Sequence, residues 1–102
     1  MNMDQIMKQA QEFQKKMGHV QEELAQKEVT ASVGGGMVSV TVNGRNELLS
    51  LNIEKEVINP DDSAMLQDLI VAAVNDAMKQ AQEMARAEMS KLTGGLNIPG
   101  LF

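Results

Sequence analysis

The sequence predicts an α+β fold in which a long helix, a three-stranded antiparallel sheet and a second long helix follow one another, before a mobile C-terminal tail. The prediction rests on where the hydrophobic pattern changes along the 102 residues. Apolar residues recur every three or four positions over residues 3–26, alternate with polar ones over 28–54, and return to helical spacing after residue 60. The length is that of one domain, so we assign residues 1–92 to a single domain and 93–102 to the tail.

The first helix is predicted to span about Met3 to Gln26. Its apolar residues follow one another at alternating steps of three and four: Met3, Ile6, Ala10, Phe13, Met17, Val20 and Leu24. This heptad spacing is typical of a helix that packs lengthwise against another helix. The remaining positions are mostly Gln, Lys and Glu, which favour helix and belong in water.

Three strands are predicted at about 28–33, 37–43 and 47–54, where apolar and polar residues alternate. The pattern predicts a sheet with one buried and one wet face. Gly34-Gly35-Gly36 separates the first two strands and Asn43-Gly44 the next two. Asn-Gly is a strong signal for a hairpin turn with positive φ angles. The three glycines lack the Lys-Ser/Thr of a phosphate-binding loop, so we interpret them as a hairpin loop.

The second helix is predicted to begin with Asn59 as its N-cap and Pro60 in its first position. No Pro or Gly interrupts residues 61–93, which would make a helix about 50 Å long. Residues 69–74 are apolar on every side of the helix, and one sheet and one helix cannot cover them. A symmetric homodimer would, and the interface residues we predict for it are Leu69, Ile70, Val71, Ala73 and Val74.

The tail contains three glycines and one proline, which exclude a continuing helix. We expect it to be mobile, with apolar side chains available for docking: Leu96, Ile98, Leu101 and Phe102.

The composition excludes several classes of function. There is no cysteine and only one histidine, so thiolate catalysis, disulfides and zinc sites are excluded, and we predict neither an enzyme nor a cofactor, metal or small-molecule substrate. No apolar run is long enough to cross a membrane, and no signal peptide begins the chain, so a cytoplasmic location is expected. The absence of Trp and Tyr argues against stacking on single-stranded bases.

The charge is unevenly distributed. The net charge is −5, but residues 1–21 and residues 77–102 each sum to +1, whereas residues 22–76 sum to −7. Antiparallel helices would gather the two basic segments into one pair of arms, which a phosphate backbone would approach. The residues we expect to meet such a backbone are Lys8, Lys15, Lys16, Lys79, Arg86 and Lys91, with Lys8, Arg86 and Lys91 nearest the tip. Solvated helices often carry such charges for solubility alone.

Four segments resemble the YbaB/EbfC family of small bacterial nucleoid-associated proteins: residues 7–11 (MKQAQ), 35–44 (GGMVSVTVNG), 65–77 (MLQDLIVAAVNDA) and 91–96 (KLTGGL). The resemblance implies an intertwined homodimer whose long helices project like tweezer arms. It also implies binding to double-stranded DNA in the nucleoid, with effects on nucleoid organisation and gene expression, and no known enzymatic activity. We expect low sequence specificity, because no recognition-helix motif is visible.

A second hypothesis is a prefoldin-like or adaptor module that binds proteins through its Met-rich helical arms. The order of helix, hairpin and helix is also the plan of prefoldin-type chaperones, although the sequence has no motif match with them. Salt dependence separates the hypotheses, because phosphate contacts weaken steeply with salt and apolar contacts do not.

Overall fold

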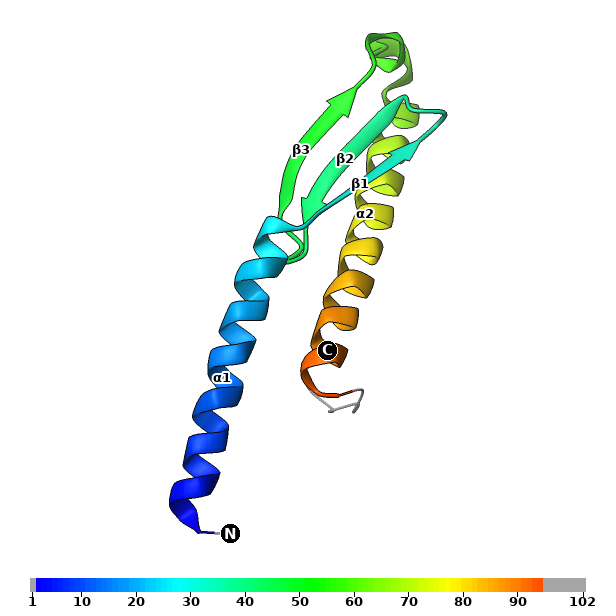
Figure 1. The fold of residues 1–102 in the computed structure, drawn as a ribbon. Coiled ribbons are helices and arrows are strands. Elements are labelled where there is room, and N and C mark those ends of the chain that lie inside the picture. The colour runs from blue at the N-terminus through cyan, green and yellow to red at the C-terminus, as the bar shows by residue number, and fades with distance from the viewer. Residues whose placement is uncertain (1, 95–102) are drawn as a thin grey trace.

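A computed structural model describes residues 2–94 of the chain, and it confirms the predicted α+β architecture (Figure 1). The elements follow the predicted order: α1 (Met3–Gln26), β1 (Glu28–Val33), β2 (Val38–Asn43), β3 (Leu48–Ile53), two short 3-10 turns (Lys55–Val57 and Pro60–Asp62) and α2 (Ser63–Leu92). The strands agree with the sequence to within a residue at each end. The predicted mobile tail lies, from residue 95 onward, outside the described residues.

The sheet is a simple meander in the order β1-β2-β3, and both pairs are antiparallel. The first hairpin closes at the pair Val33–Val38, and all three intervening glycines have positive φ angles between 63° and 93°. Residues with side chains rarely adopt this conformation, which explains the glycine run as a hairpin loop.

The core lies between α2 and the first two strands. Three alanines one turn apart, Ala73, Ala77 and Ala81, are fully buried and pack on the valines of β2. Alanine lets the helix backbone approach the sheet closely, and it costs no side-chain entropy. On the opposite face the hydroxyls of Thr30 and Thr41 form a hydrogen bond of 2.9 Å, so the predicted alternation of a buried and a wet face is confirmed for β1 and β2, whereas β3 is exposed on both faces apart from the half-buried Ile53.

The start of α2 differs from the prediction. Asn59 caps a 3-10 turn by accepting from the Asp61 amide at 3.0 Å, and Asp62 then accepts from the Met65 amide at 3.4 Å. Because the second cap follows the first by three residues, the α-helix begins at Ser63 and has 30 residues instead of the predicted 33. Asn59 was correctly predicted to be an N-cap, but it caps the 3-10 turn, and Asp62 caps the α-helix.

The molecule is a rod with extents of 69 × 22 × 18 Å. Its radius of gyration is 19.0 Å, whereas a compact chain of this length has about 13 Å. The elongation arises because α1 leaves the sheet at Lys27 and projects well beyond the end of α2 (Figure 1). The two helices flank each other over only part of their length.

The end of α1 is fastened to the turn between β2 and β3. The Gly44 amide donates to the carbonyls of Leu24 and Lys27 at 2.9 and 3.0 Å. The buried Asn43 side chain donates to Glu47 Oε1 at 2.8 Å and to the Ala25 carbonyl at 3.4 Å. Its oxygen accepts from the amides of Arg45 and Glu47, so every polar atom of this buried side chain is paired.

The expected reason for Gly44 was wrong. The residue with positive φ in this turn is Asn46, at 62°, and Gly44 is not among the residues with positive φ. Gly44 is required because a Cβ atom there would lie 2.8 Å from both the carbonyl oxygen and Cδ2 of Leu24. The constraint is therefore the close approach of α1 rather than the turn conformation.

Two glycine-to-alanine variants test this interpretation. Gly44→Ala should lower the free energy of unfolding by about 1–3 kcal/mol, because the new methyl group overpacks the end of α1. Gly18→Ala, in the exposed middle of α1 with no atom within 4 Å of the new Cβ, should raise it by about 0.5–1 kcal/mol. Thermal unfolding of both variants measures the difference. Equal shifts of the same sign would refute the packing role of Gly44.

Candidate nucleic-acid interface

The two helices pack together near the sheet and separate beyond it. Leu24 of α1 is buried, whereas Phe13, Met17 and Val20 are half-buried. Met3 and Ile6 are 72% and 48% exposed, although the heptad pattern predicted packing along all of α1. The prediction was wrong for this part, because α2 ends at Leu92, beside the middle of α1, and offers nothing further for α1 to pack against.

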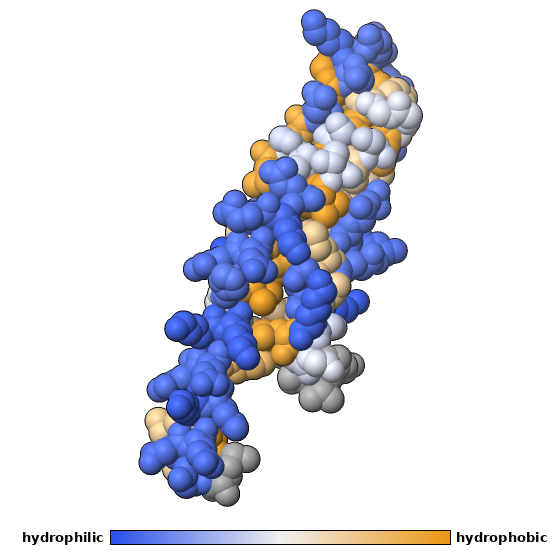
Figure 2. All heavy atoms as spheres, viewed as in Figure 1, coloured by the Kyte–Doolittle hydropathy of each residue, from blue (hydrophilic) through white to orange (hydrophobic). Residues whose placement is uncertain are grey.

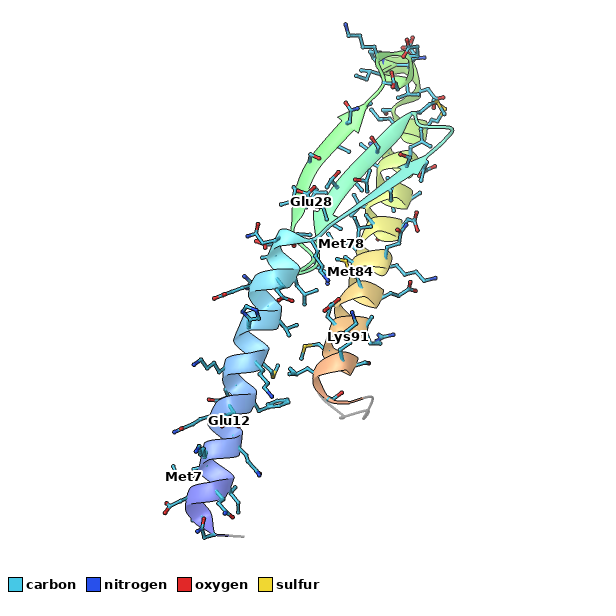
Figure 3. The ribbon with its side chains drawn as sticks, viewed as in Figure 1. Met7, Glu12, Glu28, Met78, Met84 and Lys91 are labelled. Carbon is cyan, nitrogen blue, oxygen red and sulfur yellow. The ribbon has the colours of Figure 1, made fainter. Side chains whose placement is uncertain are left out.

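All six predicted DNA-contact residues are exposed, three on each helix. Lys8 lies on the part of α1 that projects past α2, where Figure 3 labels its neighbours Met7 and Glu12. Lys8 and Lys15 are seven residues apart, so they lie on the same side of α1, about 10 Å from each other along its axis. Lys16 follows on the side that faces the end of α2.

Arg86 is not near the tip, as predicted, but near the root of the arms. It borders a hollow of about 260 Å³ together with Leu24, Gly44 and Asn46, where α1 joins the sheet. The sequence placed it near the tip because α2 was assumed to extend as far as α1. Lys91 does lie in the last turn of α2 (Figure 3), although α1 continues beyond it.

One acidic side chain joins the two helices. Glu88 Oε1 of α2 lies 2.7 Å from Lys27 Nζ, at the end of α1, and 3.3 Å from Lys91 Nζ. The hydrogen bonds from Lys27 and Lys91 hold the pKa of the Glu88 carboxyl below its ordinary value. A charged residue within the apolar stripe of α2 is the sequence signal that could have predicted this contact.

The other five predicted contact residues form no ion pair within the described chain. Within residues 2–94 the only further ion pair joins His19 and Glu23 at 3.1 Å. Lys8, Lys15, Lys16, Lys79 and Arg86 therefore make no ion pair with the acidic residues that the structure describes. Free cations on exposed helices are the groups that exchange counterions for DNA phosphates.

Four acidic residues gather at the other end of the rod. Glu54 precedes the first 3-10 turn and Glu56 lies within it, and Asp61 and Asp62 end the second, at the end of the sheet farthest from Met3 (Figure 1). A polyanion is repelled from that end and attracted to the α1 end, so the charge distribution orients its approach.

The predicted dimer residues divide into three groups. Ala73 is fully buried in the core of its own chain and has no exposed surface that could contact a second copy. Leu69, Ile70 and Val74 are half-buried beside that core. Val71 is 58% exposed. The sheet of the same chain thus covers more of the middle of α2 than the sequence predicted.

The sequence missed an apolar surface on β3. Leu51 pairs with the buried Val40 and so lies on the same face of the sheet, yet it is 44% exposed. Leu48 is 48% exposed. The cause is geometric, because α2 packs on β1 and β2 and leaves β3 uncovered. An alternating strand pattern does not tell which strands a single helix will cover.

Residues 2–94 bring together no group of three potential metal-binding side chains. None of the helices there is long and apolar enough to cross a membrane.

The helix, meander and helix, with exposed lysines on a projecting helix, suit a nucleic-acid-binding protein, and comparison with known families identifies which family it is. The model of the YbaB/EbfC DNA-binding family matches residues 1–96, so the chain belongs to this family. The resemblance found in the sequence is thereby confirmed, and DNA binding is the activity for which the family is described.

Relatives and a solved structure agree with this assignment. A nucleoid-associated protein of Clostridium novyi is 58% identical over the whole chain, which covers 90% of that protein. One from Syntrophobacter fumaroxidans is 60% identical over 95 residues, covering 93% of this chain and 86% of the relative. The crystal structure of an uncharacterized protein from Helicobacter pylori has a TM-score of 0.85 at 28% identity, covering 92% of this chain and 99% of the other.

The contact between Glu88 and Lys27 makes the stability of the helix pair depend on pH. Because the folded-state pKa of Glu88 is lowered, its contribution is fully present above the ordinary value of 4.5 and is lost as the pH falls through the lower folded value. Glu88→Gln should therefore melt below the wild type at neutral pH, and the gap should narrow below about pH 4.5. Glu83→Gln, which removes an exposed carboxylate without an ion pair in the described chain, should show no such gap. A gap for Glu88→Gln that stays constant into acid would contradict the assignment.

Proposed function

We propose that the protein is a nucleoid-associated homodimer that binds double-stranded DNA with low sequence specificity through its projecting helices. The observation that carries the proposal is the separation of charge along the rod. Lys8, Lys15 and Lys16 are exposed on α1, where the described residues pair none of them with an acid, and a cluster of four acidic residues, Glu54, Glu56, Asp61 and Asp62, lies at the opposite end. The relatives named as nucleoid-associated proteins support the nucleoid as the location.

The chemistry of the arms favours contact with the DNA backbone. Their exposed polar side chains are mainly Lys and Gln, which donate to phosphate oxygens. Phosphate contacts fix the position of a protein on DNA but carry no sequence information. The helices offer no aromatic group for stacking or wedging other than the half-buried Phe13. Low specificity follows from this set of side chains.

The exposed area supports a dimer. The chain exposes 7203 Å², whereas a compact monomer of 11.1 kDa exposes about 5,700 Å². Large apolar side chains are exposed both on the uncovered strand β3, at Leu48 and Leu51, and on α2, at Val71. We propose these exposed residues, with the half-buried Ile70 and Val74 of α2, as the dimer interface. A dimer would place two basic arms side by side for one duplex.

Val71→Glu tests the dimer. Val71 is 58% exposed in the single chain, so the variant should fold, but a symmetric interface would bury two unpaired charges at a cost of several kcal/mol. Because about 1.4 kcal/mol is tenfold in affinity, we expect dimerisation to weaken by at least about 100-fold in analytical ultracentrifugation. Ala72→Glu adds the same charge one residue along, on a different side of α2, and should leave the dimer intact. A folded wild-type monomer at micromolar concentration would sink the proposal.

Two lysines test the arms. If two or three cations per protomer meet phosphates, a dimer neutralises about 4–6, and log K should fall against log salt with a slope of about −4 to −5. Lys8→Ala with Lys15→Ala removes up to about four contacts per dimer, so the slope should flatten towards about −1 on any duplex. Surface changes of this kind cost under about 0.5 kcal/mol of stability each.

The matched control is Arg45→Ala with Lys55→Ala, two exposed cations outside the arms, which should change the slope little. Loss of DNA binding in the control but not in the arm variant would overturn the mechanism. A wild-type slope near zero would favour the alternative of a protein-interaction module, for which the exposed Met3, Ile6 and Met7 are the supporting observation.

A further inference from the structure

The projecting part of α1 carries an apolar stripe that nothing in the described chain covers. Met3 is 72%, Ile6 48% and Met7 56% exposed, and Ala10 is exposed behind them. These residues continue the row that is half-buried from Phe13 onward, where α2 lies alongside. Figure 2 shows apolar side chains between the hydrophilic side chains of α1 and α2, and again on the projecting part of α1. A contiguous apolar stripe of this kind marks a surface that something covers.

The end of α2 points along this stripe. Ala85 and Met89 border the same hollow as Met17 and Leu24, whereas Leu92 borders one formed by Glu12, Lys16 and Val20. Moving along α2 towards its end therefore means moving along α1 towards Met3. Gly94, with a φ of 66°, then ends the helical conformation. This end of the described chain lies beside the middle of α1, where the uncovered part of that helix begins.

We propose that residues 95–102 of the same chain cover the stripe between Met3 and Phe13. Half of these eight residues are large and apolar, namely Leu96, Ile98, Leu101 and Phe102, and none is charged. Eight residues reach about 26 Å when extended, whereas the stripe spans about 15 Å along the helix. The segment is thus long enough, begins in the right place and matches the stripe in chemistry.

The stripe suits this occupant better than a nucleic acid. Its exposed side chains are thioethers and hydrocarbons, with no donor or cation for a phosphate. Docking there leaves Lys8 and Lys15 free, because they lie on the opposite side of α1 from Ile6 and Ala10. The segment would act as a short third partner of the helix pair and keep the stripe from other proteins.

The absence of cysteine from the chain allows a direct test. A nitroxide attached to Leu101→Cys in the full chain should broaden the amide NMR signals of Ile6, Ala10 and Phe13 and leave those of β1 sharp. The same label on Asp61→Cys, at the acidic end, should leave these α1 signals sharp. Because no DNA is present, the result does not depend on the proposed function.

Two further measurements identify the occupant. In a mixture of isotope-labelled unmodified protein and unlabelled nitroxide-carrying protein, the α1 signals should stay sharp if each segment covers its own helix. Ile6→Glu in the labelled chain should abolish the broadening, whereas Gln5→Glu, the same charge on the side of α1 away from Met3, Met7 and Ala10, should preserve it. Sharp α1 signals in the Leu101→Cys protein would overturn the proposal, as would broadening in the mixture, which would assign the stripe to another copy.

Discussion

The close packing of three alanines of α2 on the valines of β1 and β2 determines most of what this protein presents to its surroundings. Because Ala73, Ala77 and Ala81 have small side chains, the helix lies near the sheet and covers two strands rather than three. The third strand keeps Leu48 and Leu51 exposed. A wider helix face would close the core of the single chain and remove the surface that we propose as the dimer interface.

The fold was largely predictable because its signals are local. Heptad spacing, alternation, glycine turns and the Asn-Pro start each depend on neighbouring residues, and the element boundaries were correct to within about three residues. The predictions that failed concern contacts between distant segments. The place of Arg86, the uncovered part of α1 and the exposure of β3 all depend on where α2 ends and which strands it covers, and no short window of sequence contains that information.

The same distinction applies to single residues. Gly44 and Asn43 form a dipeptide that is typical of a tight turn, and a turn is present. Their more demanding role, holding the carbonyls of Leu24, Ala25 and Lys27, involves residues 17 to 20 positions away in the chain. The six basic residues were correctly predicted to be exposed because charged side chains on helices rarely lie elsewhere, but exposure alone does not identify those that touch DNA.

The junction at Lys27 makes α1 a lever. The helix is about 36 Å long, so a tilt of about 10° at the junction moves Met3 sideways by about 6 Å, the width of the minor groove of DNA. Accurate placement of the far lysines therefore requires stiffness at the near end. The hydrogen bonds of Asn43 and Gly44 and the ion pair of Lys27 with Glu88 lie within one turn of that junction. The length of α1 sets how far its lysines lie from the sheet, and the few bonds at the Lys27 junction set the direction in which the helix points.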